Sequence, residues 1–475
     1  MNKYRKLLVN SGIFTIANFG TKLLNIVFVP LYTYWLTTDQ FGTVDLVTTT
    51  VNLLTPVVML GMSDAVMRFA FEKTVHRREL ISSGIYVFAW GALIIGIIGG
   101  VSSLLLQHVD FAFRPYIWIF LFMLYAQSVN SILAQYHRGV GNVGTFAVNG
   151  ILITVVQVLM NIITLAWLRM GISGYLISML VSYILPCVYL LLKDNVWSLI
   201  RFEYHDNELI RRMLAYTLPL IPTNMMWWVM NLSSRYVIVG TLGVAANGIF
   251  AVSNKIPTII NLLNTIFQQA WQMSAIEEYV NEDQDSGFVS RVYQYFVLFM
   301  ILGTAALMVC VYPIVHYTFS SGYASSVRYI PFMLIAAMYS NFAGFLGTNY
   351  VAAKSTSGAL KTSFVGALLN VFLTIIMVQF WGLTGVAWAM VIAYVVTWVY
   401  RAIDTKKFLN MEKLDFTLYL SMLVVTAESV VLAIVASWTA VMICIAGMAL
   451  LVLINIRVLR ELVKGIMYAH NRRGN

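Results

Sequence analysis

Fourteen long hydrophobic segments run through the chain, separated by short polar stretches. Each is long enough for an α-helix to cross a hydrocarbon core of ~30 Å, because a helix rises ~1.5 Å per residue. None shows the alternation of polar and apolar residues that is typical of membrane β-barrel strands. The sequence therefore predicts an all-α integral membrane protein with fourteen transmembrane helices, at roughly 9–37, 41–70, 81–106, 115–137, 144–168, 172–192, 213–241, 245–273, 291–317, 328–353, 360–381, 385–402, 416–436 and 438–459.

The composition supports this class. Of the 475 residues, 60% are hydrophobic and 11% are charged, whereas about a quarter are charged in a soluble domain. The three cysteines, Cys187, Cys310 and Cys444, lie far apart in apolar stretches, and this spacing indicates neither a metal site nor a disulfide framework. We expect no cofactor, no enzymatic chemistry and no nucleic-acid partner.

The positions of the lysines and arginines predict the orientation. With a cytoplasmic N-terminus, 23 of the 30 cations fall in cytoplasmic loops and tails, and only Arg114, Arg169 and Arg328 fall outside. Bacterial inner-membrane proteins carry such an excess of cations on the cytoplasmic side. Residues 1–6 are short and basic, and the apolar run behind them is long enough to span, so we expect no cleavable signal peptide. Both termini are expected in the cytoplasm.

A polar linker at 193–212 divides the chain. It separates an expected six-helix lobe at 1–192 from a second six-helix lobe at 213–402. Residues 403–475 then hold helices 13 and 14 and a cytoplasmic tail.

Two outer turns indicate a weak internal repeat. The turns at 37–46 and 243–252 each join two polar helices. Because six helices precede the second copy, both copies begin on the same side of the membrane, which makes the repeat parallel.

Three cations inside predicted spans suggest a binding site. Lys22, Arg235 and Lys255 lie within helices 1, 7 and 8. A charge near the bilayer centre costs at least ~3 kcal/mol, so such residues usually face protein or water. We therefore predict an aqueous cationic cavity that binds an anionic substrate through these three side chains.

Other acidic and basic residues in the predicted spans are candidates for structural, gating or coupling roles. Asp64 and Arg68 are one helical turn apart near the cytoplasmic end of helix 2, which fits either a structural pair or an inner gate. Glu428 lies near the middle of helix 13 and is a candidate for a groove or coupling role. Asp45 is expected to be interfacial, close to the outer surface.

Three stretches resemble a known family. They are VFVPLYTYWLTTDQFGTVDL (27–46), LGMSDAVMRFAFE (60–72) and SSRYVIVGTLGVAANGIFAVSNKI (233–256). The sequence resembles the polysaccharide-transport flippases of the multidrug/oligosaccharidyl-lipid/polysaccharide exporter superfamily, over nearly its whole length. Many relatives have an aspartate before the helix-7 arginine, where this chain has Ser234, so a local ion pair is not expected there.

The resemblance implies a function. It implies two six-helix lobes around a central, often cationic cavity, working by alternating access in the inner membrane. The substrate would be an undecaprenyl-type lipid-linked oligosaccharide, with membrane lipids as neighbours and a polysaccharide polymerase or glycosyltransferases as candidate protein partners. A cation-coupled multidrug exporter of the same fold is the first alternative, and it predicts acidic cavity residues. A membrane polysaccharide polymerase or ligase is the second, and it predicts larger outer loops.

Overall fold

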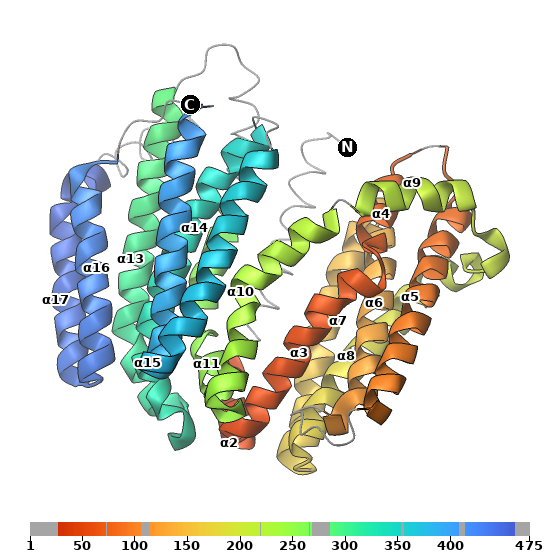
Figure 1. The fold of residues 1–475 in the computed structure, drawn as a ribbon, viewed down its shortest axis with the longest axis horizontal. Helices are drawn as coiled ribbons and strands as arrows, with labels where there is room; N and C mark the ends of the chain where they lie inside the picture. The colour runs from red at the N-terminus through yellow and green to blue at the C-terminus, as the bar shows by residue number, and fades with distance from the viewer. Residues whose placement is uncertain are drawn as a thin grey trace, which may run out of the picture. The chain divides into compact units, whose positions relative to one another are not determined.

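The computed structural model describes residues 27–460, except 73, 106–113, 219, 266, 268–285, 353–355 and 408–413. Every regular element in these residues is a helix (Figure 1). The chain forms two compact units, residues 1–248 and 249–475. The lobe and linker boundaries expected from the sequence stay predictions.

The first unit consists of helices that succeed one another through short connections. These are α2 (Val29–Trp35), α3 (Thr38–Val58), α4 (Met62–Phe69), α5 (Arg77–Leu105), α6 (Ile117–Gly139), α7 (Val143–Asn161), α8 (Gly171–Leu192), α9 (Asn207–Thr217), α10 (Leu220–Leu242) and the first residues of α11 (Val244–Ser253). A π-helical segment, Ile162–Trp167, continues α7, and 3-10 turns at Arg114–Tyr116, Lys193–Leu199 and Phe202–Tyr204 occupy connections.

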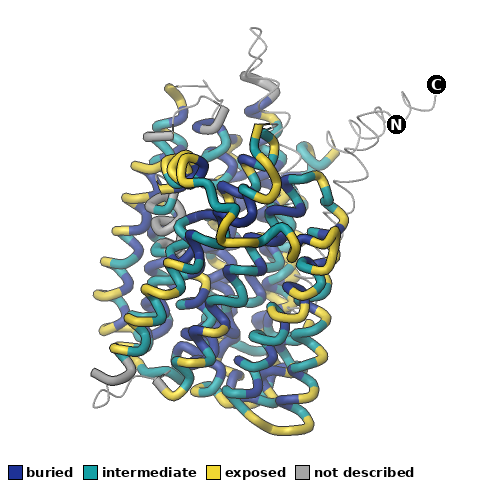
Figure 2. Tube along the Cα trace, turned by 90° about the vertical axis from the view of Figure 1, so that its right-hand side faces the viewer, coloured by how far each residue is buried: buried dark blue, intermediate teal, exposed yellow. Residues whose placement is uncertain are grey.

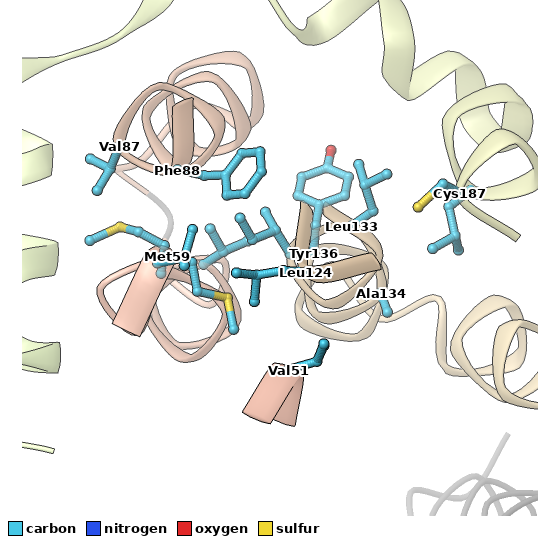
Figure 3. Close-up of a cluster of buried hydrophobic side chains, with 14 of the residues drawn as sticks. Val51, Met59, Val87, Phe88, Leu124, Leu133, Ala134, Tyr136 and Cys187 are labelled. Atoms are coloured by element: carbon cyan, nitrogen blue, oxygen red, sulfur yellow. The ribbon is translucent and has the colours of Figure 1, made fainter. Parts of the chain in front are cut away.

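The core of the first unit is apolar and densely packed. Side chains of α3, α5, α6 and α8, among them Val51, Phe88, Leu124 and Cys187, belong to one buried cluster (Figure 3). Leu124 is fully buried. Because lipid is as apolar as these side chains, close packing rather than burial from water is expected to hold the helices together.

One expected span is broken. The segment expected at 41–70 ends as α3 at Val58 and begins again as α4, because Leu60 and Gly61 adopt positive φ angles of 46° and 70°. Thr217 of α9 stabilises the break, since its hydroxyl donates a hydrogen bond to Leu60 O at 2.8 Å. The inner part of this segment is therefore a separate helix packed against α9.

The second unit is also helical. After the last residues of α11 and a helical stretch at 257–265, it contains α13 (Ser286–Thr318), a 3-10 segment at Ser321–Arg328, α14 (Ile330–Ala352), α15 (Thr356–Asp404) with a 3-10 turn at Thr405–Lys407, α16 (Phe416–Val435) and α17 (Trp438–Ile454). Gly382, with φ 54° and ψ −137°, breaks α15 into two arms. The arms correspond to the segments expected at 360–381 and 385–402.

The helices carry a membrane protein's pattern of burial. In the part of the chain that the structure describes, nine helices are long and apolar enough to cross a membrane, and Val244–Ser253 and Trp438–Ile454 are shorter apolar helices. Figure 2 shows buried and exposed positions following one another along the same helices. Exposed positions include large apolar side chains such as Ile97, Phe122 and Leu423. The all-α membrane fold is confirmed, whereas the count of fourteen spans stays a prediction.

Candidate functional site

The two outer turns have different local structures. Thr37 begins α3 with a reciprocal capping box: its hydroxyl accepts from Gln40 N at 3.3 Å, and the Gln40 side chain accepts from Thr37 N at 3.1 Å. Such a box satisfies two backbone donors that the start of a helix leaves free. Between α10 and α11, Gly243 makes the turn with φ 87°, which glycine adopts without steric cost.

The two turns meet through a pair of glycines. A Cβ added to Gly42 would overlap the carbonyl oxygen of Val244, and a Cβ added to Gly248 would overlap that of Thr38. The contact is reciprocal, because each glycine faces the carbonyl four residues before the other. Only small residues let helix backbones approach so closely. The weak repeat seen in the sequence thus corresponds here to a direct contact between equivalent positions.

A buried ion pair lies one turn further into α3. Asp45 Oδ2 accepts a hydrogen bond from Arg235 Nε of α10 at 2.7 Å. Asp45 is 8% exposed and Arg235 is 6% exposed. In such an environment the two charges stabilise each other, because a buried charge that loses an opposite charge is strongly destabilised. The pair therefore ties α3 to α10.

Asn247 extends this cluster to α11. Its side-chain amide donates to Gly42 O at 2.9 Å and approaches Asp45 Oδ2 at 3.4 Å. Asn247 is fully buried. The neighbouring Tyr236 hydroxyl shares a hydrogen bond of 2.7 Å with Thr50 of α3. We refer to Asp45, Arg235 and Asn247 as the α3–α10 polar cluster.

This cluster gives Asp45 a partner that the sequence did not indicate. The residue is buried against Arg235, and its interfacial depth stays a prediction. Ser234 precedes Arg235 in the chain, and the carboxylate that pairs with Arg235 comes from a residue 190 positions away. One feature of the sequence could have found it. Asp45 is seven residues from Thr38 at the start of α3, and Arg235 is seven residues from Leu242 at the end of α10, so both lie equally deep below the outer turns.

The other two predicted cavity cations are not members of this cluster. Lys22 lies outside the described residues. Lys255 belongs to the second unit and sits half-buried in a break at 254–256, between α11 and the helical stretch that begins at Pro257. The joint cationic site of Lys22, Arg235 and Lys255 stays a prediction.

Of the two interpretations of Asp64 and Arg68, the ion pair between them is not seen in the described residues. Both residues are exposed on α4, and Arg68 Nη1 instead lies 3.7 Å from Glu72 Oε1. Glu72 also accepts a hydrogen bond of 2.5 Å from Arg212 of α9. Glu72 is thereby held between two arginines, and it attracts Arg68 toward the end of α4 rather than toward Asp64. A gating role for Asp64 or Arg68 stays a prediction.

Glu428 lies in α16 of the second unit and is 3% exposed. The described residues contain no group of three or more histidines, cysteines or acidic residues that could hold a metal ion.

Comparison with solved structures places this fold among transporters. The chain is similar to a structure described as the lipid II flippase MurJ in an inward closed conformation, with a TM-score of 0.68 and 15% identity, over 95% of this chain and 99% of that one. It is also similar to an inward-facing multidrug resistance MATE family transporter, with a TM-score of 0.59 and 13% identity, over 82% and 95% of the two chains. The MATE multidrug transporter DinF-BH matches with a TM-score of 0.56 and 16% identity, over 86% and 96%.

At these identities the similarity shows the fold alone. No curated protein sequence matches the chain. A family model does match: that of the polysaccharide biosynthesis proteins, over residues 7–272, more than half of the chain and including the whole α3–α10 polar cluster. The protein is therefore a multi-pass membrane protein with a flippase-like and transporter-like fold, and it belongs to the polysaccharide biosynthesis protein family.

Proposed function

We propose that this protein is a flippase that moves lipid-linked oligosaccharide units across the cytoplasmic membrane for polysaccharide biosynthesis, by alternating access. The observation that carries the proposal is the polysaccharide-biosynthesis family match over 7–272, in a chain whose fold is similar to that of a lipid II flippase. The proposed substrate has an undecaprenyl-type tail that stays in the bilayer and a pyrophosphate and sugar head that crosses within the protein. The substrate crosses the membrane chemically unchanged.

The proposed head-group site uses Arg235, together with Lys22 and Lys255. A guanidinium suits phosphate oxygens because its donors form a planar fork, and an ammonium offers a compact point charge. In this mechanism Asp45 neutralises Arg235 while no substrate is bound, because a charge within the membrane is costly. The substrate's phosphate competes with Asp45 for the same side chain.

Export by charge variants tests this mechanism. The measurement is surface polysaccharide in a strain that lacks its own copy, corrected for the amount of folded protein in the membrane. Arg235→Gln should lower export about tenfold or more, which corresponds to ~1.4 kcal/mol of lost interaction. Arg235→Lys should retain more export than Arg235→Gln. Asp45→Asn removes the competitor, so its export per folded protein should equal or exceed that of the parent.

A purely structural ion pair predicts the opposite pattern. Asp45→Asn and Arg235→Gln would then lose export together, and the double variant Asp45→Asn/Arg235→Gln would regain it. That result would remove Arg235 from the proposed head-group site while leaving the flippase proposal in place. Normal export by all three of Lys22→Gln, Arg235→Gln and Lys255→Gln would contradict the cationic mechanism itself.

The similarity to multidrug transporters supports a second candidate function, the export of cationic drugs. Such a function needs an acidic group that is free to meet a cation. Asp45 is paired with Arg235, which favours the flippase. Cells that express the protein should therefore gain no resistance to cationic dyes, and dye efflux that depends on Asp45 would favour the exporter.

The membrane placement is part of the proposal. We place the chain in the cytoplasmic membrane with both termini inside. Single cysteines introduced at Lys73 and at Ser321 should be labelled from opposite sides, with Ser321 outside. Labelling of both from one side would contradict this topology.

A further inference from the structure

A second buried carboxylic acid, Glu428, lies near the middle of α16 and faces α17. Gly447 of α17 stands directly opposite, because a Cβ added to Gly447 would overlap Glu428 Oε1 and would lie 2.8 Å from Glu428 Cδ. The carboxyl group thus occupies the space that the missing glycine side chain leaves. It points into the helix pair and away from lipid, which agrees with its 3% exposure.

Both oxygens of this carboxyl group are buried and have no hydrogen-bond partner among the described residues. Among the described residues, no lysine, arginine or histidine lies within ion-pair distance of Glu428. Asp45, in contrast, is paired with Arg235. The site is therefore built to exclude water without supplying a compensating charge.

The helices around α16 carry few groups that titrate. From α17, Cys444, fully buried one turn before Gly447, faces the carboxyl. From α14, Tyr339 bonds to Thr426, two residues before Glu428. Among the described residues of α13, α14, α16 and the 3-10 segment before α14, the remaining titratable groups are Arg291, Tyr293, Tyr295, Cys310, Tyr312, His316, Tyr317, Tyr323, Arg328, Tyr350 and Tyr419. None of them forms an ion pair with Glu428.

The apolar surroundings determine whether the Glu428 carboxyl group is protonated or ionised. An isolated carboxylate in an apolar interior costs many kcal/mol, so the group takes up a proton instead. We propose that Glu428 is a proton-binding site within the membrane, protonated while α16 packs against α17 and ionised when the pair opens to water. The step is a simple exchange: the acid releases one proton to water on opening and takes one back on closing. This inference goes beyond the proposed flippase activity and does not depend on it.

Because proton binding is linked to helix packing, pH should change how firmly α16 packs against α17. The packed helix pair holds the proton more tightly than the open pair does. The packed form is therefore favoured at low pH and loses its advantage as pH rises, because the open form releases its proton first. Raising the pH should loosen the contact between α16 and α17.

Cys444 offers a native reporter for that contact. In a full-length Cys187→Ala/Cys310→Ala variant, Cys444 is the remaining cysteine, and a membrane-permeant maleimide reports its accessibility. Between about pH 6 and about pH 9, the labelling rate with Glu428 present should rise about tenfold more than in the matched Glu428→Gln variant. A carboxylate beside Cys444 disfavours the thiolate, so thiol ionisation alone would make labelling rise less with Glu428 present than with glutamine. An excess rise therefore reports opening of the contact. Equal pH dependence in the two proteins would overturn the proposal.

Carbodiimide chemistry provides a second readout. The O–H of a protonated carboxylic acid adds across an N=C bond of dicyclohexylcarbodiimide. The adduct then rearranges to a stable N-acylurea, and no group leaves. Mass spectrometry of the purified full chain should find this adduct at Glu428, declining as pH rises. Asp45 is the internal control, because its carboxylate already accepts a hydrogen bond from Arg235 Nε at 2.7 Å. Modification of Asp45 as strongly as Glu428, or of Asp45 alone, would contradict the proposed site.

Discussion

Asp45 and Glu428 are both carboxylic acids buried in membrane helices, at 8% and 3% exposure, yet their surroundings differ in one respect. Asp45 accepts a hydrogen bond from an arginine at 2.7 Å and approaches the amide of Asn247. Glu428 has neither a cation nor a hydrogen-bond donor among the described residues. Burial therefore does not decide the charge of an acid in this protein. The partner decides it, because only a fixed opposite charge offsets the loss of water around a carboxylate.

The largest expected effect comes from making the same chemical change at both acids. Asp45→Asn should lower the free energy of unfolding by ~3–5 kcal/mol, because the buried Arg235 guanidinium loses the carboxylate that faces it. Glu428→Gln should lower it by under ~1 kcal/mol, since a neutral acid is replaced by a neutral amide of similar shape. Chemical unfolding in one detergent at about pH 7 measures both.

The control for this comparison is the double variant Asp45→Asn/Arg235→Gln, which removes both charges and should recover more than half of the loss. Equal costs for the two single changes would break the comparison between a paired and an unpaired acid.

Next in size is the effect of filling the space opposite Glu428. Gly447→Ala adds a Cβ that overlaps the carboxyl oxygen, and overpacking of this kind costs ~1–3 kcal/mol. The cost should shrink when Glu428→Ala is made in the same chain, because the overlapping group is then gone. Gly240→Ala is the matched control, since a Cβ there meets nothing within 4 Å. A Gly447→Ala cost that Glu428→Ala does not relieve would mean that the carboxyl lies elsewhere.

A change at Asn247 separates the contribution of its side-chain amide from that of the Asp45–Arg235 ion pair. Asn247→Ala removes the donor to Gly42 O while leaving the ion pair intact. A lost hydrogen bond of this kind costs ~1–2 kcal/mol, well below the cost expected for Asp45→Asn. The same chemical-unfolding measurement applies. A loss as large as that of Asp45→Asn would show that the amide, rather than the ion pair, holds α3 against its neighbours.

The smallest change in the free energy of unfolding is expected for an ion pair near the protein surface. Arg68 is exposed and Glu72 is partly buried, and ion pairs near the surface contribute ~0–1 kcal/mol. Arg68→Gln should therefore change the free energy of unfolding by under ~0.5 kcal/mol. Export measured beside it tests the gate hypothesis for Asp64 and Arg68: a folded, stable Arg68→Gln protein that no longer exports would support a gate, and normal export would exclude one at Arg68.

Part of the candidate site was accessible from the sequence. Arg235 and Glu428 stand out because charges are rare in long apolar segments, and hydropathy alone reveals them. The partner of Arg235 was harder to find, because only the matching depth of Asp45 below the other outer turn links the two residues. The break at Leu60 and Gly61 was missed for a related reason. Apolar residues continue through it, so the hydropathy pattern contains no sign that the helix stops.

By itself, then, the sequence determined the all-helical membrane architecture, the family resemblance and the presence of charges within the spans. These properties follow from the transfer of each segment into lipid, which depends on the segment's own residues. Only the tertiary structure decided that Asp45 neutralises Arg235, that Arg68 turns to Glu72 and that Glu428 faces Gly447. The Arg68–Glu72 contact is local to the end of α4, whereas the other two contacts depend on how one helix is rotated against another. That rotation is set by close packing at positions such as Gly42 and Gly248, and it leaves no trace in the hydropathy of a single segment.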